Sequence, residues 1–300
     1  MSQAKYFNLQ KKNNPNYFKD FNFLSFNIDK KILLDINKCI IDLFSHSEGK
    51  KFNSMNQVMN FLNKTHFYKL KRDLNIMTKL EGILCGYFSK IKVFNKSIKG
   101  IQFPLDIRIA HPKQPKKLKK KKYLTSSIHC DTWTEEPKDI INGILYLSVN
   151  DRSPKINILK TSESEINTYK AYAETYKTKF FLNSRKYFSI LKDLKKKKSC
   201  KLDHKNGQVM IFNGFTPHFT VRKGKEVRLS LEFRVKTKNP YENVNAWSKL
   251  NNHARYWFLP NKNVNNFSQR LKQEYLNIRK MRNYQQLINK RNKEIEKNLI

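Results

Sequence analysis

The sequence predicts a mainly β fold, a jelly roll or barrel, with flanking helices. Between about residues 100 and 236, short apolar segments typical of strands follow one another closely. Turn-forming residues separate them, for example at 150–154 and 223–225. Before about residue 95, and in one insert within the β region, apolar residues instead recur at steps of three and four, which indicates amphipathic helices.

The expected strands can be read directly from the sequence. In chain order they are IQFPLDIRIA (101–110), YLTSSIHCDTW (123–133), INGILYLSV (141–149), KINILK (155–160), GQVMIF (207–212), HFTVRK (218–223) and VRLSLEFRV (227–235). The basic run 112–122 is expected to be a solvated loop.

These patterns divide the chain into three parts. We expect a helical region over 1–95 that packs on the core, a β core over 96–240 with a helical insert at 163–194, and a basic helical tail over 241–300. Ser162 and Glu165 have the spacing of a capping box at the start of the insert. The tail helix, from about 266, has a narrow apolar stripe that suits docking on the core or pairing of two copies into a homodimer.

The charge is strongly basic, at +37, but 49 of the 61 basic residues are lysine. Such a charge favours anionic partners, including nucleic acid, whereas the Lys-rich and Arg-poor balance favours compositional bias over specific recognition. Four scattered cysteines, without a CxxC pair, exclude a disulfide scaffold and a zinc knuckle. There is no apolar run long enough for a membrane span, and we expect a reduced, cytoplasmic setting.

One group of residues predicts a metal site. His129 and Asp131 are two positions apart on an expected strand, so their side chains project from the same face. His218 begins a later strand, after the turn that contains Asn213 and Gly214. Two imidazoles and one carboxylate suit Fe(II) and leave open positions for a chelating co-substrate and O2, although zinc accepts the same ligands.

Arg228 follows His218 by ten residues, with Ser230 two positions further on. In the strand 227–235 the polar side chains at 228, 230, 232 and 234 alternate with apolar ones. This face is either the wet side of a surface strand or turned into the barrel. In the second case Arg228, with help from the Ser230 hydroxyl, would bind a carboxylate.

HxD, a distal histidine and Arg-x-Ser ten residues later resemble the Fe(II)/2-oxoglutarate oxygenases of the double-stranded β-helix, or cupin-like, fold. Over residues 100–236 the chain is most similar to the phytanoyl-CoA hydroxylase-like branch, including oxygenases of streptomycin-type and surface-carbohydrate gene clusters. The resemblance implies a dioxygenase in which His129, Asp131 and His218 bind Fe(II), while Arg228 and Ser230 bind 2-oxoglutarate. It further implies O2-dependent hydroxylation of a small molecule or sugar-derived metabolite.

Three further residues are candidates for the substrate or co-substrate site. Trp133 either lines that site or belongs to the core, and Asn142 either reaches the co-substrate or caps a turn. The third, Arg234, is separated from Arg228 by five residues, which resembles the paired arginines of alkylation-repair nucleic-acid demethylases. Such a demethylase, or a non-catalytic cupin-like binding protein, is therefore the alternative function.

Overall fold

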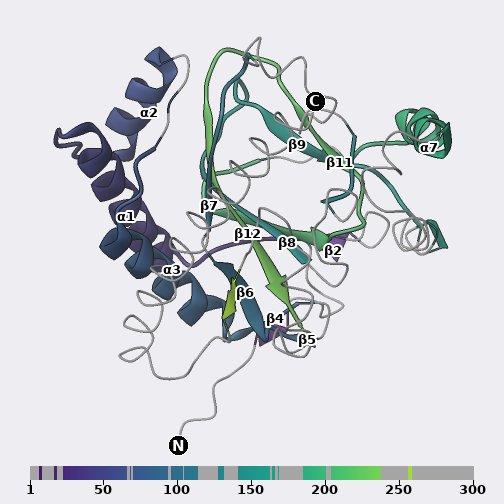
Figure 1. Ribbon diagram of the computed structural model, residues 1–300, viewed down its shortest axis with the longest axis horizontal. Coiled ribbons are helices and arrows are strands. Elements are labelled where there is room, and N and C mark those ends of the chain that lie inside the picture. The colour runs from purple at the N-terminus through teal and green to yellow at the C-terminus, as the bar shows by residue number, and fades with distance from the viewer. Residues whose placement is uncertain are drawn as a thin grey trace, which may run out of the picture.

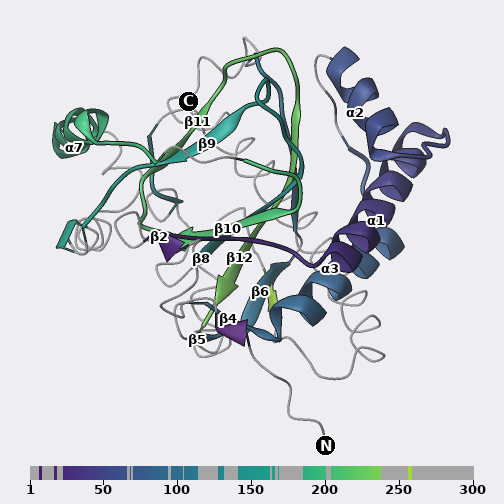
Figure 2. The ribbon, with the colours of Figure 1, turned by 180° about the vertical axis from the view of Figure 1, so that it is seen from behind.

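The computed structural model describes residues 7–8, 17–18, 23–65, 68, 70–93, 96–103, 105–113, 128–131, 141–162, 164–165, 168, 185–200, 204–237 and 256–258. These residues form mainly β structure with a few helices (Figures 1 and 2). None of the helices among them is long and apolar enough to cross a membrane.

The largest sheet has eight strands, and its order along the hydrogen-bonded path is β13-β6-β12-β8-β10-β3-β2, with β7 paired to the first half of β12. Its strands are β2 (Tyr17–Phe18), β3 (Phe23–Asn27), β6 (Gly100–Phe103), β7 (Asp106–Ala110), β8 (Ile141–Ser148), β10 (Gln208–Asn213), β12 (Arg228–Lys236) and β13 (Tyr256–Phe258). Two small sheets pair β9 (Lys155–Ile158) with β11 (His218–Val221), and β1 (Phe7–Asn8) and β5 (Lys96–Ser97) with β4 (Ile91–Val93).

Three helices cover the outer face of the main sheet, on one side of the molecule in Figure 1. They are α1 (Lys30–Glu48), α2 (Met55–Lys64) and α3 (Leu74–Phe88). Each begins at a side-chain cap, from Asp29, Ser54 and Asp73, that accepts a hydrogen bond from a first-turn N–H group. The outer face contributes Leu229, Leu231, Phe233 and Val235 of β12 to this helix-covered core.

The inner face of the main sheet packs against β9. Tyr146 of β8 and Met210 of β10 join Ile156 and Ile158 of β9 in a second buried cluster. Side chains alternate between the two cores along each strand because neighbouring residues of a strand point to opposite faces. The polar residues of β12 therefore share the inner face, and Arg228 and Ser230 are fully buried there, so the surface-strand interpretation is wrong.

The structure corrects several expected boundaries. Segment 101–110 forms two strands, β6 and β7, and around His129 only a single β-bridge is present in the described part of 123–133. The N-terminal region contains the three helices but also supplies β3, which pairs with β10 inside the main sheet. The pattern FNFLSFN is common to many short amphipathic segments, and β10, its pairing partner, lies far away in the sequence. The sequence alone therefore does not indicate this strand.

Other expectations can be followed only in part. Ser162 and Glu165 form the capping box, with Ser162 N–H donating to Glu165 Oε2 at 2.8 Å and Glu165 N–H to Ser162 Oγ at 3.2 Å. The insert ends in α7 (Arg185–Lys196), and most of 163–184 lies outside the described residues. The tail helix from 266 and Trp133 also lie outside them. All four cysteines are buried, and none of them forms a disulfide.

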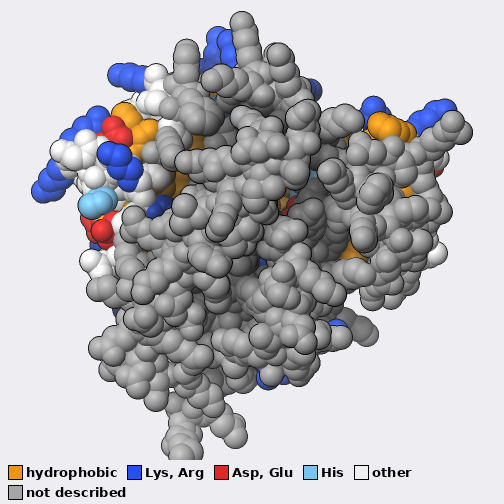
Figure 3. Space-filling model, viewed as in Figure 1, with side chains coloured by type: hydrophobic (Ala, Val, Ile, Leu, Met, Phe, Trp, Pro, Cys, Tyr) orange, Lys and Arg blue, Asp and Glu red, His pale blue; other side chains and the backbone are white. Residues whose placement is uncertain are grey.

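Basic side chains appear in several places in the described surface of Figure 3, including the side of α1 and α2 and, on the opposite side of the view, the region of α7. Exposed lysines of α7 include Lys192, Lys195 and Lys196.

Candidate metal and anion site

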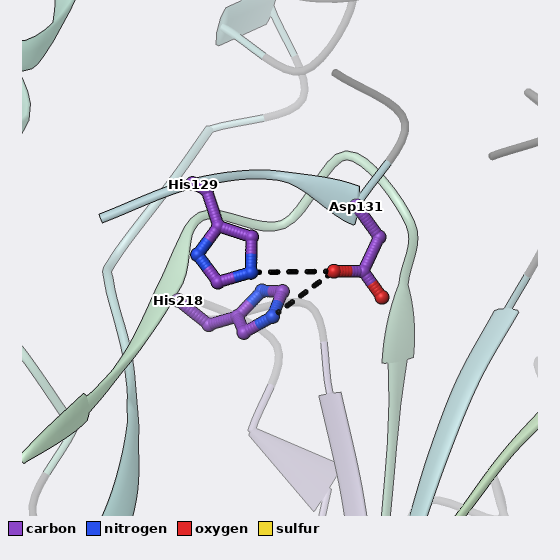
Figure 4. A group of neighbouring side chains, drawn as sticks. All are labelled: His129, Asp131 and His218. Carbon is purple, nitrogen blue, oxygen red and sulfur yellow. Dashed lines mark ion pairs between the residues drawn. The ribbon is translucent and has the colours of Figure 1, made fainter. Parts of the chain in front are cut away.

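The backbone brings the two histidines together. His129 N–H donates to the His218 carbonyl at 3.0 Å, and His218 N–H donates to the His129 carbonyl at 2.9 Å. This antiparallel bridge places the imidazole rings side by side, with centroids 4.4 Å apart. Asp131 follows two residues after His129, and its carboxylate meets both rings (Figure 4).

The potential ligand atoms converge on one point. Asp131 Oδ1 lies 3.4 Å from Nε2 of His129 and 3.4 Å from Nε2 of His218. One ligand atom from each residue lies within 4.8 Å of the others. Ligands bound about 2.1 Å from a common metal lie roughly 3 Å apart, so only small side-chain shifts separate this arrangement from a coordinated one. The three residues therefore fit a divalent transition-metal ion.

His218 is already oriented for this role. Its Nδ1 lies 3.0 Å from the Thr216 carbonyl oxygen, which only accepts hydrogen bonds, so Nδ1 carries the proton. With Nδ1 held by that carbonyl, Nε2, which faces Asp131, is the ring nitrogen that would give up its proton and offer a lone pair to a bound metal. Phe212 packs against the same ring at a centroid distance of 4.8 Å and limits its rotation.

Asp131 stays ionised in this setting. Burial raises the pKa of its carboxyl, but the Arg234 guanidinium and hydrogen bonds from His129 and His218 outweigh that effect and hold the pKa well below its usual value. Arg234 Nη2 donates to Asp131 Oδ2 at 2.9 Å, while Arg234 Nη1 lies 3.8 Å from Asp106. One carboxylate oxygen is thus held by Arg234, and the other faces the histidines.

Arg228 and Ser230 also lie on the inner face of the main sheet, nearer than Arg234 to the start of β12. Arg228 is 1% exposed, and its Nη2 donates to Glu232 at 3.2 Å. Arg228 Nε and Nη1, and the fully buried Ser230 Oγ, have no hydrogen-bond partner among the described residues. Because buried polar groups are normally paired, these donors fit a ligand carboxylate, which would supply the missing acceptors.

Asn142 belongs to β8 and does not cap a turn. In register it lies opposite Arg234 of β12 and Phe212 of β10, the residues that contact Asp131 and His218. Its side chain is buried, at 4% exposed, and neither amide atom has a partner in the described part of the chain. A buried amide without partners beside the metal-site residues fits the co-substrate interpretation.

The structure adds charged residues that the sequence reasoning did not select. Asp106 approaches Arg234, and Arg108 lies directly across from Ser230 in the register of β7 with β12. Arg222, just beyond β11, donates from Nη1 to the His111 carbonyl. Alternation of Asp106, Arg108 and Ala110 was the only available signal, and it could not show which face turned inward.

Comparison with known proteins finds only remote similarity, and only among solved structures. No protein-family model and no curated protein matches the chain. Among solved structures, the non-heme alpha-ketoglutarate-dependent carbocyclase SnoK from nogalamycin biosynthesis has 10% identity and a TM-score of 0.42, covering 80% of this chain and 93% of its own. An N-substituted L-amino acid dioxygenase from Burkholderia ambifaria AMMD, in complex with alpha-KG, has 14% identity and a TM-score of 0.33, covering 71% and 81%.

A third similar structure is AviO1 from Streptomyces viridochromogenes Tue57, with 9% identity, a TM-score of 0.35 and coverage of 73% and 91%. All three TM-scores lie below 0.5, so these similarities carry no weight in assigning a function to this chain. The functional argument below depends on the side chains themselves.

Proposed function

We propose that the protein is a non-haem Fe(II), 2-oxoglutarate-dependent dioxygenase. The observation that carries this proposal is the combination of two features on one side of the main sheet. One is the group of His129, Asp131 and His218, and the other is Arg228 with two guanidinium nitrogens that lack a partner among the described residues. A metal-binding protein without an oxo-acid co-substrate has no need of a buried arginine with unused donors on the same sheet face.

Each residue has a definite task in this proposal. Two imidazoles and one carboxylate hold Fe(II) and leave open positions for a chelating ligand and O2. Arg228 and Ser230 bind the distal carboxylate of 2-oxoglutarate, and the absence of competing water makes these charged hydrogen bonds strong. When bound, the iron would supply the O2-dependent oxidative decarboxylation of 2-oxoglutarate to succinate and CO2, coupled to oxidation of a C–H bond.

The finer assignments belong to the same proposal. The main sheet and the β9–β11 pair would form a double-stranded β-helix of the phytanoyl-CoA hydroxylase-like kind, with Asn142 and Arg234 near the reacting groups. A small molecule, such as a sugar-derived metabolite, is the proposed substrate class. Retention of Asp131 favours hydroxylation over halogenation, since the carboxylate takes the position that a halide would need.

The test is reconstitution of the full-length chain with Fe(II) under anaerobic conditions. We expect one Fe(II) per chain, a saturable response to 2-oxoglutarate in calorimetry, and slow succinate release after O2 is admitted. Asp131→Ala should lose metal binding and succinate release. Asp193→Asn, an exposed carboxylate on α7 that pairs with Lys196, is the matched control and should retain both.

Two results would decide against this function. If the wild-type chain binds neither Fe(II) nor 2-oxoglutarate, the non-catalytic binding protein is favoured. Succinate release that is stimulated by an alkylated oligonucleotide, and by no sugar or other small molecule, would favour the demethylase.

A further inference from the structure

Glu232 places its carboxylate between two arginines at the anion site. Its Oε1 lies 3.2 Å from Arg228 Nη2 and 3.9 Å from Arg108 Nε. Glu232 follows Arg228 by four residues, so both lie on the inner face of β12. Arg108 reaches the same oxygen from β7, where it lies opposite Ser230.

The local charge is unbalanced. Arg222 donates from Nη1 to the His111 carbonyl, next to Ala110, which lies opposite Arg228 in the register of β7 with β12. Burial lowers the pKa of Arg222, and the charges of Arg108 and Arg228 lower it further. Within the described part of the chain, Glu232 is the one carboxylate that pairs with any of the three arginines. Three positive charges with one negative charge favour the entry of another anion.

Glu232 also uses only part of the binding capacity of Arg228. It engages Nη2, whereas Nε and Nη1 of Arg228 have no partner among the described residues. A guanidinium binds a carboxylate best through two parallel N–H groups. An incoming carboxylate can therefore approach the unused edge of Arg228, but it meets the negative charge of Glu232 next to it.

We propose that Glu232 is a resident counter-ion that competes with the distal carboxylate of 2-oxoglutarate, and that Arg108 receives Glu232 when the co-substrate binds. The inference rests on the proposed function. It assigns two residues, Glu232 and Arg108, that set the affinity for a dicarboxylate without belonging to the metal site. The Glu232 side chain is 21% exposed, whereas that of Arg228 is 1% exposed. Glu232 can therefore move towards solvent when the incoming carboxylate displaces it from Arg228.

The experiment measures 2-oxoglutarate binding to the full-length, Fe(II)-loaded chain by calorimetry without O2. Glu232→Gln removes the competing charge and should lower the Kd for 2-oxoglutarate by about tenfold, the scale of one hydrogen bond to a charged group. Glu232→Asp shortens the reach to Arg228 but keeps the charge, and should give a smaller gain. Glu226→Gln is the matched control, because Glu226 pairs with Arg152 at 3.2 Å and not with Arg228.

Two further arms separate competition from a structural role. Oxalate chelates the metal but is too short to reach a distal arginine, so its Kd should be the same in wild type and Glu232→Gln. Arg108→Gln removes the guanidinium that would receive the displaced Glu232 carboxylate, and should raise the Kd for 2-oxoglutarate several-fold. That loss should be smaller in the Glu232→Gln background, where no charge needs to be displaced.

The inference is overturned if Glu232→Gln and Glu232→Asp both leave the Kd for 2-oxoglutarate unchanged or raise it. An equal gain for oxalate and 2-oxoglutarate would also overturn it, since the effect would then act at the metal. If neither wild type nor Glu232→Gln binds 2-oxoglutarate while both bind Fe(II), the proposed function itself fails, and this inference fails with it.

Discussion

Arg234 and Asp131, 103 positions apart in the sequence, form a hydrogen-bonded ion pair in which Nη2 lies 2.9 Å from Oδ2. Arg234 is in turn within 3.8 Å of Asp106 through Nη1, which holds the guanidinium from its other side. The pair fixes the rotation of the Asp131 carboxylate, so that Oδ1 is presented to both histidines. Arg234 is therefore a positioning residue for the metal ligand.

Arg234→Gln should weaken metal binding by about tenfold or more, because loss of a partner that orients a metal ligand typically costs 10–100-fold in affinity. Removing a positive charge from the neighbourhood of a dication acts in the opposite direction, but it does not restore the orientation. Arg234→Lys keeps the charge without the planar fork and should recover only part of the affinity. Calorimetric titration with Co(II) measures this, and unchanged or tighter binding by Arg234→Gln would contradict it.

Much of the β core could be predicted because alternation is a local property. The strands around 141–148, 208–213 and 228–236 lie close to their expected ranges. His129, Asp131 and His218 could be selected only together with Arg228 and Ser230, because the His-x-Asp spacing is common by chance. Their close approach depends on the β-bridge between His129 and His218, which joins segments that the sequence only shows to be strand-like.

The residues that tune the site could not be predicted in the same way. Arg108 and Glu232 come from different strands, and their approach depends on the register of β7 with β12. A shift by one residue would turn either side chain to the helix-covered face. The same limit applies to β3, whose place beside β10 follows from long-range pairing and not from the composition of FNFLSFN.

Asn142→Ala should weaken 2-oxoglutarate binding without lowering the stability of the protein. The buried amide has no partner among the described residues, so its loss removes unsatisfied polar atoms and should leave the stability of the metal-free protein within about 1 kcal/mol of wild type, or above it. The same change should weaken 2-oxoglutarate binding about fivefold to tenfold, since one or two ligand hydrogen bonds are lost. Thermal unfolding and calorimetry measure the two effects.

Asn37→Ala provides the matched control for Asn142→Ala. Asn37 lies on α1, and its Oδ1 is likewise buried without a partner among the described residues. Its replacement should leave 2-oxoglutarate affinity unchanged. Equal affinities in wild type and Asn142→Ala, or a large loss of stability in Asn142→Ala, would show that the amide has a structural role.

Gly143→Ala should destabilise the fold. An added Cβ at Gly143 would lie 2.0 Å from the Phe233 ring, which packs on Phe88 with centroids 4.8 Å apart. Overpacking of this kind typically costs about 1–3 kcal/mol. Chemical denaturation should show this loss, and Phe233→Leu should recover part of it by vacating the space.

The contrast for Gly143→Ala is Gly82→Ala in α3, where nothing lies within 4 Å of the added Cβ. Alanine is favoured over glycine inside a helix, so Gly82→Ala should stabilise the protein by about 0.5–1 kcal/mol. Similar effects of the two substitutions would contradict the packing described around Phe233.

Glu81→Gln should make the stability of the protein less sensitive to a rise in pH from the acidic to the neutral range. Burial raises the pKa of the Glu81 carboxyl well above its usual value, although the Leu105 N–H, which donates to Oε1 at 3.0 Å, and the Arg72 charge act in the opposite direction. Between the unfolded pKa, near 4.3, and the raised folded pKa, the folded state binds more protons than the unfolded state. Wild-type stability therefore falls as pH rises through that interval, by at most about 1.4 kcal/mol per pH unit from this group. Glutamine keeps the acceptor for the Leu105 N–H without the charge. The free energy of unfolding of the variant should therefore match that of wild type near pH 4 and exceed it increasingly towards neutral pH. Urea unfolding at several pH values measures the difference, and parallel stability curves for the two proteins would mean that Glu81 does not titrate in the folded state as described.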